Sequence, residues 1–163
     1  MDLLNVKSAM PLGNKKSMRG AAAVEMALVL VSMLVLILGV AEFGRALYQY
    51  NTLTKAVRDA ARYLSQSDTS DASKYDEAKD DAKCLAVYGS LSCASQALAA
   101  GLTTDMVSIN TINQITEAGA SITLVEVVIT GFTFNFFLNP LVFLGGGDQS
   151  ITFGDIRAIM RQS

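Results

Sequence analysis

The chain has 163 residues, a formal net charge of −2, 51% hydrophobic residues and 17% charged residues, a size that fits one ordinary domain or a small domain with an anchor. It contains no histidine, the commonest general base and metal ligand, and its two cysteines are too few for a four-thiolate zinc site. The lack of a basic excess argues against bulk binding of nucleic acid. These features disfavour an enzyme, and we expect no catalytic residue, no metal, no cofactor and no nucleic-acid partner.

Residues 21–41, AAAVEMALVLVSMLVLILGVA, form an apolar run that contains one charge, Glu25, and no proline. As a helix, the run is about 31 Å long, which matches the hydrocarbon thickness of a bilayer. A buried core helix is the alternative, but the rest of the chain is too short to enclose a helix that is apolar on all sides. The run therefore predicts a single transmembrane helix.

The charges on either side of this run predict its orientation. Residues 1–20 carry four basic side chains and one acidic side chain, a net charge of +3, whereas residues 42–163 carry nine basic and thirteen acidic side chains, a net charge of −4. The positive-inside rule then places residues 1–20 in the cytoplasm and residues 42–163 outside it. No second span is predicted, because the apolar stretch 132–144 is too short to cross a bilayer.

Glu25 is unusual, because a carboxylate in a membrane helix costs about 2.5–3.5 kcal/mol at the bilayer centre and less near an interface. It is either solvated at headgroup depth or paired. It is also the fifth residue after Gly20, which follows a basic leader and precedes three alanines. Together with the string EFGRALY at residues 42–48, this arrangement resembles the N-terminal region of TadE-like proteins, the pilin-like minor components of bacterial tight-adherence (Flp-type) pilus machines. The resembling part covers residues 19–63.

The resemblance implies a minor pilin or pseudopilin of the bacterial inner membrane that takes part in assembling adhesion pili, with a cytoplasmic N-terminus and a periplasmic outer domain. It implies a processing site that comprises Gly20, Ala21 and Glu25, at which a prepilin peptidase cuts between Gly20 and Ala21. Glu25 then has the new α-amine of a neighbouring subunit to pair with. Partners would be the peptidase, other pilin-like subunits and the assembly platform. The residues leave open an uncleaved single-pass membrane protein whose outer domain binds a protein or a ligand.

Beyond the apolar run, hydrophobic residues recur every three or four positions and predict one continuous helix over about 21–65, which packs on the outer domain. These residues are Phe43, Leu47, Tyr50, Leu53, Val57, Ala60 and Leu64. A second helix is expected over about 73–88, with a capping box that starts at Ser73 and a stop at Gly89. The acidic residues between 68 and 81 lack the ligand pattern of a calcium loop and predict a solvated helix face.

The two cysteines, Cys84 and Cys93, are separated by eight residues. The spacing alone would suit a redox pair, half of a metal site or two free thiols. Because the segment is expected outside the cytoplasm, a structural disulfide is the favoured interpretation. It would tie the end of the second helix to the following loop.

The C-terminal third predicts strands over 106–112, 121–136 and 150–160, because these segments are rich in Val, Ile, Thr and Phe. A turn is expected at 117–120 and a bulge at Gly154-Asp155. The predicted fold class is α+β and pilin-like: a long N-terminal helix, a short second helix and a small, mainly antiparallel sheet. The expected organisation is a leader (1–20), a transmembrane helix (21–41), its outer continuation (42–65) and an outer α+β domain (66–163).

The densest apolar cluster outside the membrane lies within residues 132–144, and a small sheet with one helix is too small to bury all of it. Core packing and an exposed patch for a partner or for the outer leaflet are both open. The proposed interaction patch is Phe136, Phe137 and Phe143. Replacing all three with serine separates the two: loss of folding indicates core, and loss of complex formation indicates an interface.

Overall fold

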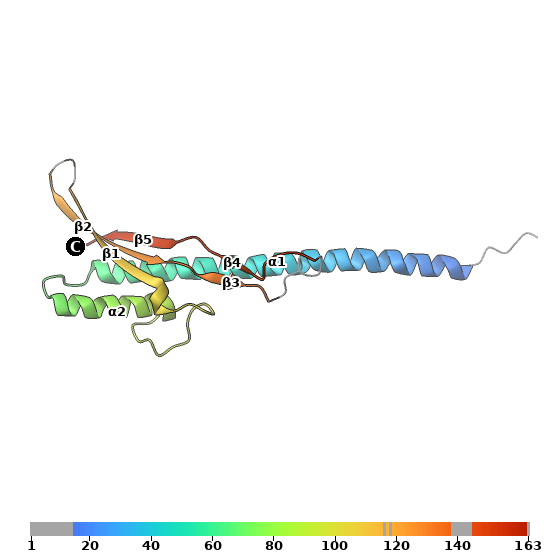
Figure 1. Cartoon of the computed structure of the whole chain (residues 1–163), viewed down its shortest axis with the longest axis horizontal. Coiled ribbons are helices and arrows are strands. Elements are labelled where there is room, and N and C mark those ends of the chain that lie inside the picture. Colours follow the sequence, from blue (N-terminus) through green and yellow to red (C-terminus); the bar gives the residue numbers. More distant parts are fainter. Residues whose placement is uncertain (1–14, 116, 118, 138–144, 163) are drawn as a thin grey trace, which may run out of the picture.

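A computed structural model describes residues 15–115, 117, 119–137 and 145–162, with side chains from residue 20 onward. A single helix, α1 (Lys15–Ser65), is the longest element. Its 51 residues make a rod about 76 Å long at 1.5 Å per residue, and Figure 1 shows this rod extending far beyond the rest of the molecule. The continuous helix is confirmed, and it begins at Lys15, ahead of the expected start at residue 21.

The second helix, α2 (Ala72–Tyr88), is confirmed, but its predicted cap is not. Asp71 is the N-cap, because its carboxylate accepts hydrogen bonds from the backbone N–H groups of Ser73 and Lys74. The capping box at Ser73 is therefore wrong, since Ser73 already lies in the first turn. Gly89 ends the helix with φ +69°, the left-handed conformation that glycine adopts without a steric penalty.

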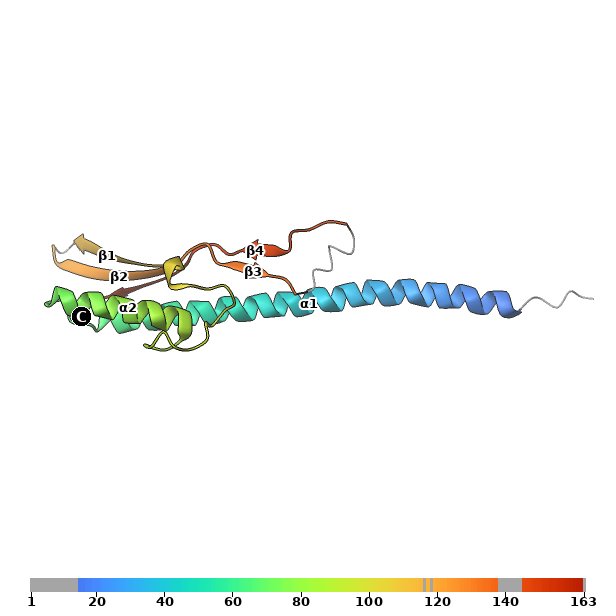
Figure 2. The ribbon, with the colours of Figure 1, turned by 60° about the horizontal axis from the view of Figure 1, so that its bottom comes forward.

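The strands form two antiparallel sheets. The first has the order β1-β2-β5, from β1 (Val107–Ile115), β2 (Ser121–Ile129) and β5 (Ile156–Arg161); a 3₁₀ turn, η1 (Thr104–Met106), precedes it. The second pairs β3 (Thr133–Asn135) with β4 (Ser150–Thr152). The three-stranded sheet and α2 both lie along the C-terminal half of α1 (Figures 1 and 2).

Two of the three predicted strands are interrupted. The strand expected over 121–136 is divided into β2 and β3 at Gly131, whose φ of +69° turns the chain. The strand expected over 150–160 is divided into β4 and β5, so the predicted bulge at Gly154-Asp155 is instead the crossing from one sheet to the other. The chain passes between the two sheets twice, after β2 and after β4. A backbone hydrogen bond from Phe153 N to Phe132 O (2.9 Å) joins these two connecting segments.

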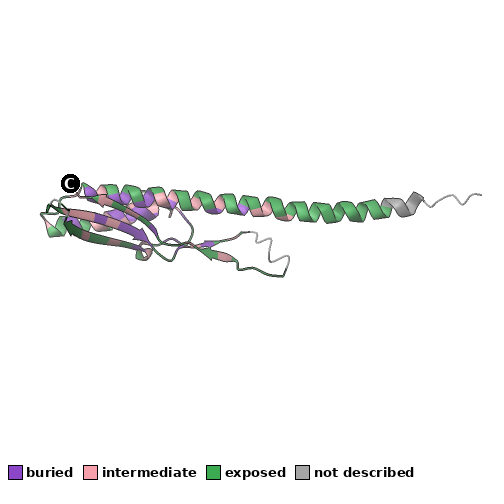
Figure 3. Cartoon of the chain, turned by 90° about the horizontal axis from the view of Figure 1, so that it is seen from above, coloured by how far each residue is buried: buried purple, intermediate pink, exposed green. Residues whose placement is uncertain are grey.

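The core fills the space between α1, α2 and the inner face of the three-stranded sheet. Leu53, Val57 and Leu64 of α1 are fully buried there, as predicted for the C-terminal part of the apolar stripe. The earlier part of the stripe is different, because Phe43 and Leu47 are 64% and 46% exposed. Figure 3 shows this division as a helix that is buried at its C-terminal end and exposed along its N-terminal half.

Candidate functional site

The N-terminal half of α1 is apolar and bare. An 18-residue window within Gly20–Ser65 has a mean hydropathy of 2.6, and none of it is buried against the rest of the molecule. By length and composition this helix could span a membrane. Large side chains such as Val24, Leu28 and Leu36 are each more than 60% exposed. A continuous apolar surface of this size requires a bilayer or other subunits to cover it.

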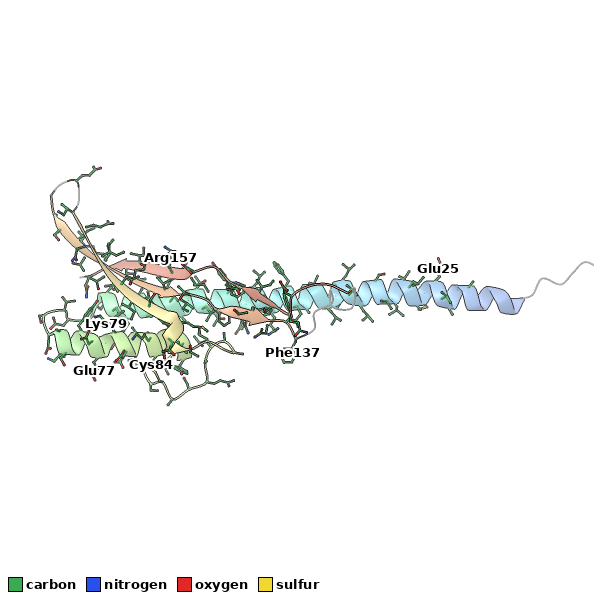
Figure 4. All side chains as sticks on the ribbon, in the orientation of Figure 1. Glu25, Glu77, Lys79, Cys84, Phe137 and Arg157 are labelled. Atoms are coloured by element: carbon green, nitrogen blue, oxygen red, sulfur yellow. A yellow bond between two sulfur atoms is a disulfide. The ribbon has the colours of Figure 1, made fainter. Side chains whose placement is uncertain are left out.

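Gly20, Ala21 and Glu25 all lie on this bare helix, and all three are exposed. Figure 4 shows Glu25 on the shaft, far from the sheets and from α2. Within the part of the chain that has described side chains, no ion pair reaches Glu25. A Cβ added at Gly20 would meet no atom within 4 Å. The helix therefore presents this carboxylate outward, with space around it for another chain.

A polar junction connects the end of the bare helix to the segment that follows β3. Glu42 and Arg45 lie one turn apart on α1 and form an ion pair with an Nη2–Oε2 distance of 2.8 Å. The same Arg45 nitrogen donates a hydrogen bond to the backbone carbonyl oxygen of Asn135 (2.5 Å). The backbone N–H of Phe137 in turn donates to Glu42 Oε2 (3.4 Å). Helix and strand are thus joined through both members of one ion pair.

Aromatic rings complete this junction. The Arg45 guanidinium lies 4.3 Å from the ring centroid of Phe134 and 5.3 Å from that of Phe137. Phe134 is buried, with 1% of its surface exposed, whereas Phe137 is 84% exposed. The Glu42 side chain is only 11% exposed, and a charge in such surroundings is stable only when it is paired and hydrogen-bonded. The junction meets this requirement and holds β3 against α1.

The predicted interaction patch is resolved in part. Phe136 is half-buried and packs edge-to-face on Phe134, with ring centroids 5.4 Å apart. Phe137 projects from the end of β3, where Figure 4 labels it beside α1. Phe143 lies outside the described residues. Of the two patch residues that the structure describes, Phe136 therefore packs against the molecule and Phe137 is exposed.

One family of proteins is similar to the helix just described. Residues 20–62 match the model of the TadE-like protein family. This match confirms the resemblance seen in the sequence. The TadE-like segment includes Gly20, Glu25 and the Glu42–Arg45 pair, and it ends inside the buried part of α1. No curated protein and no solved structure gives a significant match to the chain.

The disulfide between Cys84 and Cys93 lies outside the TadE-like segment and is present in the structure. It joins the last turns of α2 to the loop that follows Gly89, as expected from the sequence. The same loop is also held by a backbone hydrogen bond from Leu98 N to Val87 O (2.8 Å). Among the described residues, no group of three or more His, Cys, Asp or Glu side chains is placed to hold a metal ion.

The junction at Arg45 was not predicted from the sequence. The EFGR string carried the family resemblance, and Glu42 with Arg45 at i,i+3 is a spacing that predicts an ion pair on one helix face. The third partner is the backbone carbonyl of Asn135, which lies 90 residues away in the sequence. No side-chain pattern marks a carbonyl acceptor, so the long-range contact has no signal in the sequence.

Proposed function

We propose that this chain is a minor pilin or pseudopilin of a tight-adherence pilus machine in the bacterial inner membrane. The observation that carries the proposal is the TadE-like match over the exposed apolar half of α1. The N-terminus is cytoplasmic and the sheets are periplasmic, as the net charges of the two flanks favour. The role is structural: the chain binds other pilin-like subunits and the assembly platform through its helix.

The first step is removal of the leader by a prepilin peptidase between Gly20 and Ala21. The leader carries the net charge of +3 that holds the helix at the cytoplasmic face. Its removal leaves a new α-amine on Ala21, which is largely protonated at neutral pH. Cleavage therefore replaces the basic leader with a single positive charge at the N-terminus of the apolar helix.

The second step is lateral assembly through Glu25. The carboxylate is exposed on the bare helix, and an unpaired charge at this depth is unfavourable in hydrocarbon. The α-amine of a neighbouring subunit supplies the opposite charge, and pairing offsets part of the desolvation cost of both groups. Glu25 thus favours the assembled state over the isolated subunit in the membrane.

Matched glycine variants test the processing step. We expect Gly20→Val to abolish cleavage in cells that carry the machine, because the residue before the cut is altered. Gly44→Val is the control, since it lies on the same helix and a Cβ at either glycine meets no atom within 4 Å. Gel mobility and intact mass report cleavage. Equal processing of both variants would contradict the proposal.

A charge-removing variant tests the assembly step separately. We expect Glu25→Gln to be inserted normally, and its cleaved form to be recovered with pilin-like subunits at a much lower level than the cleaved native chain. Wild-type recovery of this variant would exclude the pairing role. If the native chain is never cleaved and is recovered alone, the uncleaved single-pass membrane protein replaces the pilin-like interpretation.

A further inference from the structure

An apolar groove runs along the outside of α1 beneath the two-stranded sheet. Its floor is one face of the helix from Val35 to Tyr50, and its opposite wall includes Phe136, Ile151 and Phe153. Its volume is about 950 Å³, the upper end of the range for sites that hold one small molecule. In Figures 1 and 2, β3 and β4 extend along α1 toward its bare half, past the end of the three-stranded sheet.

The length of the helix places this groove at a definite depth, and this step depends on the membrane topology in the proposed function. The hydrocarbon takes about 20 helical residues, and the headgroup region on each side takes about four or five more. With residues 21–41 in the hydrocarbon, the outer leaflet begins near about residue 31 and its headgroup region ends near about residue 46. The groove, whose floor runs from Val35 to Tyr50, therefore begins in the hydrocarbon of the outer leaflet and ends just beyond the headgroups.

The exposed residues at this level fit a lipid environment. Phe43, Tyr48 and Phe137 are 64%, 72% and 84% exposed, and aromatic side chains of this kind are enriched where a membrane meets water. The floor of the groove continues without a break into the bare apolar surface below it. The hydrocarbon that covers that surface can enter the groove without crossing a polar barrier.

We propose that this groove holds an acyl chain of an outer-leaflet phospholipid, so that the two-stranded sheet is part of the membrane-embedded surface. The polar junction at Arg45 supports this arrangement, because it fixes the end of β3 on α1 and keeps the groove wall in place. Apart from Asp148 and Ser150, the residues that line the groove are apolar or aromatic, which suits a hydrocarbon chain.

Tryptophan fluorescence in vesicles tests this proposal, because the native chain contains no tryptophan. The full chain is reconstituted into vesicles of phosphatidylethanolamine and phosphatidylglycerol that contain lipids with brominated acyl chains, which quench tryptophan on contact. Ile151→Trp reports the wall of the groove, Leu30→Trp reports the spanning helix, and Ile159→Trp on β5 is the exposed control. We expect Ile151→Trp to lose as much fluorescence as Leu30→Trp, and Ile159→Trp to lose none.

The possible results distinguish a lipid in the groove from the chain itself or a second copy. They also distinguish failure of the lipid site from failure of the proposed membrane topology. Quenching of Leu30→Trp without quenching of Ile151→Trp overturns the lipid site and leaves the membrane topology intact; the groove is then filled by the chain itself. No quenching of Leu30→Trp overturns the topology on which the proposed function depends. If quenching of Ile151→Trp falls as the protein-to-lipid ratio rises, a second copy displaces the lipid as the resident occupant and the proposal is wrong.

A second pair of variants covers the case in which tryptophan in β4 prevents folding. Leu47 lies in the floor of the groove, whereas its neighbour Tyr48 is at the same height and outside it. We expect Leu47→Trp to be quenched more strongly than Tyr48→Trp. Equal quenching would mean that the helix is immersed without a seated lipid, and it would contradict the proposal.

Discussion

At the residue scale, Arg45 has the largest number of partners at the junction between the helix and the sheets. It is paired with Glu42, bonded to the carbonyl of Asn135 and stacked over two phenylalanine rings. Hydrogen bonds to charged groups contribute about 1.5–3 kcal/mol each. The attachment of β3 to α1 thus depends more on this side chain than on any single apolar contact there.

We predict that Arg45→Ala loosens β3 without unfolding the molecule. The backbone N–H of Phe136, which donates to Gln149 O at 2.9 Å, should exchange with deuterium about tenfold faster, since about 1.4 kcal/mol of local stability is lost. Hydrogen exchange of the full chain in micelles measures this. Arg58→Ala, an exposed change on the same helix, is the control, and equal protection in both variants would refute the role of Arg45.

Two tyrosines, Tyr75, which is buried, and Tyr63, which is half-buried, provide a second test at this scale. Among the described residues, the hydroxyl of Tyr75 has no hydrogen-bond partner, whereas that of Tyr63 donates to Asp81 Oδ2 (3.2 Å). A buried polar group without a partner is destabilising. Tyr75→Phe should therefore raise the free energy of unfolding by about 1 kcal/mol, and Tyr63→Phe should lower it by about 1 kcal/mol. Denaturant titration followed by circular dichroism distinguishes the two, and a loss in Tyr75→Phe would contradict the assignment.

At the element scale, the contact between α1 and α2 has a pH-sensitive component. Burial, followed by the hydrogen bond to Asp81, raises the pKa of Tyr63 above its ordinary value. The folded state therefore keeps this proton longer than the unfolded state does. The stability from this group is fully present below about pH 10 and falls as the pH rises through the folded pKa. Tyr63→Phe should flatten the alkaline part of the stability curve; an unchanged slope would exclude Tyr63 as the source.

The disulfide between Cys84 and Cys93 also stabilises the region around α2. It closes a loop of about ten residues after α2, for which chain entropy gives about 2–3 kcal/mol. The Cys84→Ser/Cys93→Ser double variant should lose this amount in denaturant unfolding and should become insensitive to reductant. The native chain with and without reductant is the internal comparison. A native chain whose unfolding midpoint does not respond to reductant would contradict a stabilising bridge.

The elements themselves could be predicted from the sequence to differing degrees. The long helix and α2 follow from periodic apolar residues, and Gly89 marks the end of α2 where the structure has it. The strand break at Gly131 was missed and the one at Gly154 was predicted only as a bulge, because composition favours a continuous strand on both sides of each glycine. Only the long-range pairing of β3 with β4 shows that these segments leave the first sheet, and pairing is not visible in local sequence.

The same limit applies to the candidate site. The apolar span and its lone acid could be read directly, since a run of hydrophobic residues and one charge are local features. Gly20, Ala21 and Glu25 stay predictions, because a single subunit holds neither the peptidase nor the neighbouring helix with which they interact. The groove required the structure, since its two walls come from segments about 100 residues apart.

At the scale of the whole molecule, the fold separates two tasks along one helix. The C-terminal half of α1 completes the core with α2 and the three-stranded sheet, while the N-terminal half remains apolar and uncovered (Figure 3). Because the core does not use the bare half, the transfer of that half from lipid to neighbouring subunits, which the proposed function requires, would not unfold the domain. The junction at Arg45 marks the boundary between the two tasks.

This division predicts that assembly and stability respond to different variants. Glu25→Gln should leave the unfolding midpoint of the full chain unchanged, since Glu25 is exposed and far from the core, yet it should reduce recovery with pilin-like subunits. Val57→Ala should do the reverse: removing buried methyl groups costs about 1–3 kcal/mol and leaves the exposed helix face intact. Parallel loss of stability and recovery in Glu25→Gln would contradict the separation.

In the proposed function the chain acts as a cleaved rod whose fifth mature residue is Glu25. The most direct measurement is the intact mass of the chain isolated from native cells together with its associated subunits. We predict a chain that begins at Ala21 and is recovered with other pilin-like proteins. A chain that retains residues 1–20 in those complexes would contradict it.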